Sequence, residues 1–140
     1  MENRKGLKII ITGDKEFDDY QLFKKEVLRV IGERAKQLGY DKIPKELITI
    51  ISGAANNTDK MAKKFADEFN IEIERFIADR VKHGNNAGKI RNQEMIIASF
   101  KEMNNNDRIL IAFWDEKTLN TKCMIDVAKD TLIDTYVIRY

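Results

Sequence analysis

The residues whose types and spacing most clearly suggest a binding site lie between positions 80 and 91. This segment holds four lysine or arginine residues and the only histidine of the chain, and it contains no aspartate or glutamate. It also holds two glycines and two asparagines, and Asn92 follows it directly. Cationic side chains on a glycine-containing loop that leads into a helix suit an anion, and guanidinium groups bind phosphate with paired hydrogen bonds. We therefore expect a phosphate site here, held chiefly by Lys82 and Arg91.

Several side chains of this segment have simpler interpretations. Lys82 and Lys89 are also consistent with solvated surface charges, and a lone histidine is more often structural than catalytic. His83, with Gly84 beside it, is either such a structural residue or a hydrogen-bond donor and acid–base group for the ligand. The density of cations without any acid favours the anion site over these alternatives.

Another candidate segment follows the first predicted strand, where Gly13 precedes Asp14 and Lys15. Glycine allows backbone N–H groups to approach a ligand closely. Asp14 suits a ribose hydroxyl better than a phosphate, because like charges repel. The spacing is not the glycine pattern of dinucleotide-binding folds, so an ordinary strand-to-helix turn is an equal alternative.

Residues 52–59 form a third candidate segment without a bulky side chain, and Thr58 is a candidate N-cap for the helix that follows. Small residues let an anion approach the free N–H groups of a helix N-terminus, and an acid in the first turn matches the helix dipole. The alternative is simple capping of the helix. The contact residues that we expect here are Ser52, Gly53, Ala54, Asn56 and Asp59.

The aromatic and sulfur-containing residues are less specific. Trp114, the only tryptophan, ends a predicted strand and either stacks on a base or belongs to the core. Phe17 is a second candidate for stacking, for which a core position is the simpler interpretation. The single cysteine, Cys123, and the single histidine exclude an internal disulfide and a multi-histidine metal centre. No Walker, zinc-protease or nucleophile-elbow motif occurs, and we expect neither a metal nor a cofactor.

Short apolar runs alternate with amphipathic segments and predict the elements that position these groups. Strands are predicted at residues 7–12, 47–51, 71–76, 108–113 and 135–138. Helices are predicted at residues 19–38, 58–69, 90–103 and 120–130. This order predicts an α/β fold: one Rossmann-like, doubly wound domain over residues 1–140 with a mainly parallel five-stranded sheet. The loops at the carboxyl ends of its strands should converge on one ligand site.

Composition limits the partners that this domain can have. The net charge of +2 is too small to predict general binding of nucleic acid, so the basic patch is local. No apolar run approaches the roughly 20 residues that span a bilayer, and the charged N-terminus does not resemble a signal peptide. We therefore expect a cytoplasmic protein without membrane contact.

Taken in order, four segments resemble motifs of the YspA-like proteins, the YpsA-related branch of the SLOG (SMF/DprA–LOG) superfamily. Residues 11–20 are similar to the opening TGSRxFxDY motif, and residues 51–59 are similar to SGGARGxD. Residues 78–95 are similar to ADWxxxGxxAGxxRNxxM, and residues 112–125 are similar to AFWDGKSxGTxxMI. The resemblance covers nearly the whole chain, and its Gly and Arg-Asn segment is the most specific part.

The resemblance implies a Rossmann-like fold that binds a nucleotide or a nucleotide-derived signal. It also implies a bacterial or phage origin and a homo-oligomer, since relatives commonly form dimers. Carried over by position, it implies a site lined by Gly13, Lys15, Ser52, Gly53, Asp59, Arg91, Asn92, Lys117 and Thr121.

The same resemblance bears on whether the ligand is cleaved. The related phosphoribohydrolases carry a catalytic glutamate in a PGGxGTxxE motif, and Met124 stands at that position here. We therefore expect a sensor or sponge that binds a nucleotide-derived small molecule intact. A nucleotide N-glycosidase with Arg91 and Asp14 as candidate catalytic residues is the alternative. Binding of single-stranded nucleic acid is a third possibility, against which the small net charge argues.

Overall fold

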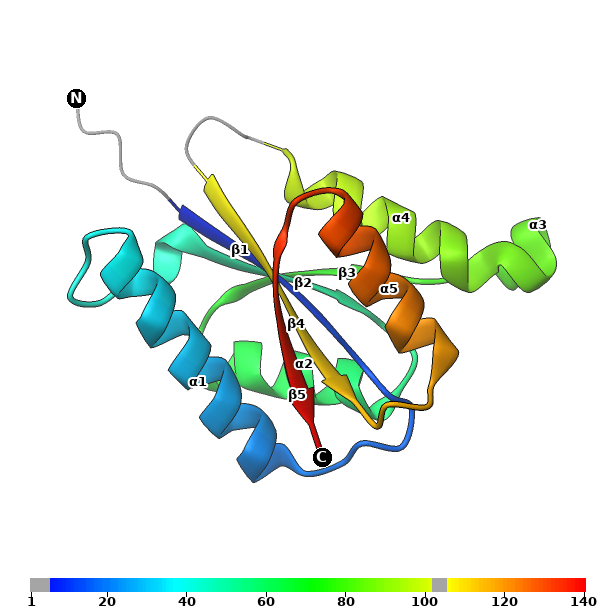
Figure 1. Ribbon diagram of the computed structural model, residues 1–140, viewed down its shortest axis with the longest axis horizontal. Coiled ribbons are helices and arrows are strands. Elements are labelled where there is room, and N and C mark those ends of the chain that lie inside the picture. The colour runs from blue at the N-terminus through cyan, green and yellow to red at the C-terminus, as the bar shows by residue number, and fades with distance from the viewer. Residues whose placement is uncertain (1–5, 102–105) are drawn as a thin grey trace.

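The computed structural model describes residues 6–101 and 106–140, which form a five-stranded, all-parallel sheet flanked by helices (Figure 1). The strands lie in the order β3-β2-β1-β4-β5. The α/β class and the parallel five-stranded sheet predicted from the sequence are thus confirmed. The strand bounds are β1 (Gly6–Gly13), β2 (Ile48–Gly53), β3 (Glu72–Phe76), β4 (Asn106–Trp114) and β5 (Asp134–Arg139).

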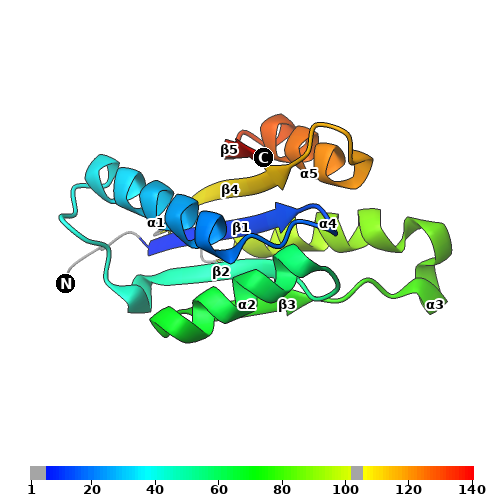
Figure 2. The same cartoon turned by 90° about the horizontal axis from the view of Figure 1, so that it is seen from below.

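Helices cover both faces of this sheet. One face carries α1 (Tyr20–Gln37) and α2 (Asn57–Phe69), and the other carries α4 (Ala87–Ser99) and α5 (Leu119–Asp130), as Figure 2 shows. The shorter helical turns are η1 (Lys45–Leu47), α3 (Arg80–His83) and η2 (Gly84–Asn86). Within the described residues, every helix is too short or too polar to cross a membrane.

The central strand, β1, shows why both faces need helices. All eight of its residues are buried, and successive side chains of a strand point to opposite faces. Ile9 and Ile11 join the core beneath α1 and α2, whereas Ile10 joins the core beneath α4 and α5. An apolar run such as Ile9 to Ile11 is typical of a parallel strand buried on both sides.

The direction of winding reverses at β1. The chain passes from β1 to β2 and β3 on one side, and then crosses to β4 and β5 on the other side. β1 pairs in parallel with both β2 and β4, and its last residue, Gly13, lies opposite Phe113 of β4. Open α/β sheets bind ligands at the carboxyl ends of the strands beside such a reversal. The loops after β1 and β4 therefore flank the expected ligand position.

The basic segment is largely helical, so its interpretation as a loop was wrong. Asp79 caps α3, because its carboxylate accepts a hydrogen bond from the Lys82 backbone N–H at 3.0 Å. Gly84 follows with a φ of 55°, and α4 begins at Ala87 instead of position 90. The end predicted for this helix, position 103, lies outside the described residues. The cations of this segment are consequently distributed over a helical surface.

Candidate functional site

A cleft with a volume of about 650 Å³ lies at the carboxyl ends of the strands, which is within the usual range for small-molecule sites. Four segments that are distant in the sequence meet there: the loops after β1 and β2, the stretch from β3 into α4, and the start of α5. The lining residues are Gly13, Lys15, Ala55, Asn56, Ile77, Ala78, Arg80, Asn85, Gly88, Lys89, Arg91, Thr118, Asn120 and Thr121.

The lining of this cleft is positively charged. It includes Lys15, Arg80, Lys89 and Arg91, and it includes no aspartate or glutamate. A concave surface that carries charge of one sign focuses its electrostatic potential and concentrates counter-ions. The cleft is therefore suited to an anionic ligand.

Arg91 is the buried cation of this group, with 8% of its surface exposed. Its Nε atom donates a hydrogen bond to Asn92 Oδ1 at 3.1 Å. Its Nη1 atom is buried and has no hydrogen-bond partner in the part of the chain that the structure describes. A buried donor without a partner costs roughly 1–3 kcal/mol, and more when it is charged, because it has lost its water. Arg91 also lines the cleft, so an anionic oxygen that reached this atom would satisfy it.

Gly53, the last residue of β2, makes room for this guanidinium. A Cβ atom at position 53 would lie 2.4 Å from Arg91 Nη1 and 2.9 Å from Asp59 Oδ2. Both distances are shorter than real carbon contacts, so any side chain here would displace Arg91 or Asp59. The glycine at the end of β2 is therefore part of the site although it does not line the cleft.

The first turn of α5 adds backbone donors. Thr118 precedes this helix but makes no side-chain capping bond, and its hydroxyl donates to Asp115 Oδ2 at 3.0 Å. Backbone hydrogen bonds from Thr118 and Lys117 lower the pKa of Asp115, which keeps it an acceptor within the loop. The first N–H groups of a helix lack partners within the helix and favour an anion. Thr118, Asn120 and Thr121 place this turn on the cleft wall.

The loop before α2 uses its donors internally. Asn56 Oδ1 accepts a hydrogen bond from the Asp59 backbone N–H at 2.9 Å. Asp59 Oδ2 accepts from the backbone N–H groups of Ala55 and Asn56 at 3.0 and 3.1 Å, and Asp59 Oδ1 accepts from the Ser52 hydroxyl at 3.2 Å. These bonds favour the capping alternative for this loop. Asn56 and Ala55 still line the cleft.

Asp14 is buried and is held by donors of the protein itself. Its Oδ1 atom accepts from the Thr121 hydroxyl at 2.7 Å, and its Oδ2 atom accepts from the Tyr140 hydroxyl and the Asp115 backbone N–H, both at 2.6 Å. Burial, followed by the bond to Asp14, raises the pKa of Tyr140 and keeps this phenol a donor. Asp14 therefore links β1 to α5 and β5, and this engagement competes with the ribose contact expected from the sequence.

The two aromatic candidates lie away from the cleft lining. Phe17 is buried and stacks on Phe113 with ring centroids 4.8 Å apart. Trp114 donates its indole N–H to the Thr118 carbonyl at 3.0 Å and packs against the core beneath α4 and α5. Both rings are thus engaged in packing, which favours the core interpretation of each.

Other predicted contact residues lie beside the cleft without lining it. The short helix α3 presents Arg80 to the cleft, and helical periodicity turns Lys82, two positions later, in another direction. Asn92 is buried and donates from Nδ2 to Asn120 Oδ1 at 3.4 Å. The predicted residues outside the lining also include Ala54, Lys82, His83, Gly84 and Lys117.

The structure adds lining residues that the sequence reasoning did not select. Arg80 and Lys89 belong to the basic segment, but only its helical form shows that they accompany Arg91. The i, i+3 spacing of Gly88 and Arg91 was a signal for one helix face. Asn120 could not be selected from the sequence, because its contact with Asn92 forms only when α4 and α5 pack together.

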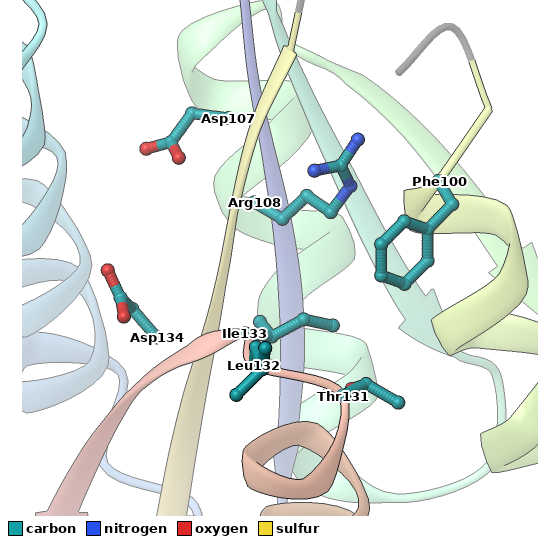
Figure 3. Close-up of a pocket in the computed structure, with 7 residues that line it drawn as sticks. All are labelled: Phe100, Asp107, Arg108, Thr131, Leu132, Ile133 and Asp134. Carbon is teal, nitrogen blue, oxygen red and sulfur yellow. The ribbon is translucent and has the colours of Figure 1, made fainter.

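A smaller pocket lies at the opposite ends of the strands (Figure 3). Its volume of about 100 Å³ is too small for a nucleotide. The Arg108 guanidinium lies 4.4 Å from the centre of the Phe100 ring, and its Nε atom donates to the Ser99 carbonyl at 3.0 Å. Figure 3 shows Asp107 and Asp134 directed toward α1 instead. The carboxylates and the guanidinium therefore do not form one site.

In residues 6–101 and 106–140, no cluster of three or more histidine, cysteine, aspartate or glutamate side chains is arranged to hold a metal ion. No protein-family model matches the chain, and no curated protein matches it either. The similarity to the YspA-like proteins rests on the sequence motifs alone and stays a prediction.

Proposed function

We propose that this protein binds a phosphate-bearing, nucleotide-derived small molecule in the cleft and retains it intact, as a sensor or sponge. The observation that carries the proposal is the buried, unpaired Nη1 atom of Arg91 in a cleft lined by four cations and no carboxylate. Hydrogen bonds from guanidinium to phosphate are charge-assisted and are among the strongest in proteins.

The size of the cleft supports a ligand larger than phosphate alone. Its volume of about 650 Å³ leaves room for a sugar and a base in addition to a phosphate. Ile77, Ala78 and Ala55 supply apolar surface there, and Asn56, Asn85 and Asn120 supply amide donors and acceptors. A mixed lining of this kind suits a nucleoside better than a second highly charged group.

The chemistry of the lining supports binding over hydrolysis. General acid–base catalysis relies most often on histidine, glutamate or aspartate within hydrogen-bond reach of the reacting atoms, and the residues that line the cleft include none of these. The motif similarity to the YspA-like branch of the SLOG superfamily supports the same function. The proposal includes a cytoplasmic location and a homo-oligomeric state, as expected from the sequence.

The test is to incubate the purified protein with a pooled panel of nucleoside monophosphates, cyclic nucleotides and dinucleotide-derived signals. Mass spectrometry would then analyse the protein-bound fraction and the solution separately. We expect a phosphate-bearing molecule retained intact by the native protein and by Arg29→Ala, an exposed arginine of α1, and lost in Arg91→Ala. Release of a free base into solution would replace the proposal with the N-glycosidase alternative. Retention of nothing by the native protein would reject both.

A further inference from the structure

A second cleft lies at the end of the sheet opposite the candidate site. Figure 2 shows the last turn of α1, the segment before β2 and the last turn of α2 at the same end of the molecule, away from α3. The cleft among these segments has a volume of about 470 Å³. It shares no lining residue with the cleft that holds Arg91, so its chemistry has to be explained separately.

The walls of the second cleft are apolar. Eight of its ten lining residues are hydrophobic or proline, including Leu28 and Ile31 of α1 and Phe65 and Phe69 of α2. Mostly apolar walls with a few polar groups are characteristic of small-molecule sites. Leu28 remains 41% exposed, which is surface that an apolar ligand would cover.

The segment before β2 is a preformed wall of this cleft. Tyr40 donates its backbone N–H to the Ala35 carbonyl at 2.8 Å. Leu47 donates its backbone N–H to the Pro44 carbonyl at 2.9 Å. The proline ring also fixes the backbone φ angle at position 44. Ile43 is buried, with 2% of its surface exposed. A ligand would therefore not have to order this wall on binding.

The two remaining lining residues are Lys42 and Lys45. Neither side-chain nitrogen forms an ion pair or hydrogen bond with the described residues. Apolar walls with two unpaired ammonium groups complement a molecule that has a hydrocarbon body and a single anionic head. We infer that this cleft binds a small amphipathic carboxylate, with its body between α1 and α2 and its head at Lys42 and Lys45.

Calorimetric titration with decanoate, decanol and decylammonium tests this inference, because the three probes share one body and differ in head charge. Decanoate should bind about fivefold more tightly than decanol, which two exposed ion pairs would supply, and decylammonium should bind most weakly. The double variant Lys42→Glu/Lys45→Glu should invert the order of the charged probes, which would also show that it is folded. The matched control Lys101→Glu/Lys129→Glu changes exposed lysines elsewhere and should keep the native order.

Leu28→Trp, which fills the cleft mouth, should abolish binding of all three probes. The inference is overturned if the native protein shows no saturable decanoate binding, or if charge reversal leaves the preference for decanoate unchanged. It is also overturned if light scattering shows a dimer that Leu28→Trp dissociates and decanoate does not, because the occupant would then be a second copy of the chain.

Discussion

Arg91 is the residue on which the proposed function depends most. It is buried against Gly53, and one of its guanidinium nitrogens has no partner among the described residues. An arginine that serves only the fold would be expected to pair this nitrogen with a carboxylate or carbonyl. Under the proposed function, this unpaired donor lowers the stability of the ligand-free protein and is satisfied when the ligand binds.

Arg91→Met should raise the stability of the ligand-free protein. Methionine keeps an apolar stem of similar length and removes the unpaired buried charge, so the free energy of unfolding should increase by about 1 kcal/mol. The same variant should lose binding of the retained nucleotide. Urea unfolding and calorimetry measure the two effects, and a less stable variant would show that Arg91 supports the fold.

Gly53→Ala tests the space that Arg91 occupies. The new methyl group would meet Arg91 Nη1 and Asp59 Oδ2, so we expect a loss of roughly 1–3 kcal/mol of stability together with weaker ligand binding. Gly32→Ala is the control, because nothing lies within 4 Å of the Cβ position at Gly32 in α1. It should stabilise the protein by about 0.5–1 kcal/mol. Equal effects at the two glycines in chemical denaturation would contradict this account.

Two tyrosines should make stability fall at high pH. Burial and a bond to Glu68 raise the pKa of Tyr20, and burial and a bond to Asp14 raise the pKa of Tyr140. The folded protein therefore keeps these protons more tightly than the unfolded chain, whose phenols ionise near pH 10. The stabilisation is complete below about pH 10 and is lost above it.

Lysine side chains titrate in the same pH range as phenols. The double variant Tyr20→Phe/Tyr140→Phe separates the effect of the two tyrosines from theirs. Its unfolding free energy should decline less steeply between about pH 9 and 11 than that of the native protein. Parallel curves for the two proteins would show that neither phenol is linked to folding.

At the scale of elements, the first turn of α5 is a source of backbone donors beside Arg91. Leu119, the first residue of this helix, is 78% exposed, and Thr118 before it has an extended backbone. Proline is favoured at the first position of a helix and is compatible with an extended preceding residue. A proline at position 119 would therefore remove one N–H donor without disturbing the helix.

Leu119→Pro should leave the unfolding free energy within about 0.5 kcal/mol of native. It should weaken binding of the retained nucleotide by about tenfold to a hundredfold, since a hydrogen bond to a charged group contributes roughly 1.5–3 kcal/mol. Leu119→Ala keeps the N–H group and serves as the control in the same titrations. Native affinity in the proline variant would exclude this N–H group from the site.

The elements also show which features a sequence can predict. The strand at 7–12 was predictable, because a run of β-branched residues buried on both faces has few alternatives. The helical turns at 80–86 were not, because four-residue and three-residue turns are too short to show a period. The engagement of Asp14 was not predictable either, because its partners Thr121 and Tyr140 are distant in sequence.

At the scale of the whole molecule, the candidate site and an ion-pair cluster occupy opposite ends of the sheet. Arg34 of α1 donates from Nε to Asp107 at 2.9 Å and from Nη1 to Asp134 at 2.7 Å. These bonds tie α1 to the starts of β4 and β5. The arrangement places this ion-pair cluster far from the residues that line the cleft at Arg91.

Arg34→Ala should therefore lower stability without affecting binding. Removing the guanidinium leaves the partly buried Asp107 without its partner, which should cost roughly 1–3 kcal/mol of unfolding free energy. Arg29→Ala removes exposed pairs on the same helix and should cost at most about 1 kcal/mol. Nucleotide affinity should equal the native value in both variants, because distant sites act independently. A loss of affinity in Arg34→Ala would show that the two ends are coupled.

The most direct test of the central claim is an NMR titration that observes the arginine side chains and the backbone amides of the labelled protein. Adenosine monophosphate and inorganic pyrophosphate are the probes. We predict saturable shifts of the Arg91 side-chain signals together with the amides of residues 119–121, while the signals of Arg29 and Arg34 stay unchanged. An Arg91 signal that does not respond to either probe, or shifts confined to exposed lysines, would contradict a phosphate site in this cleft.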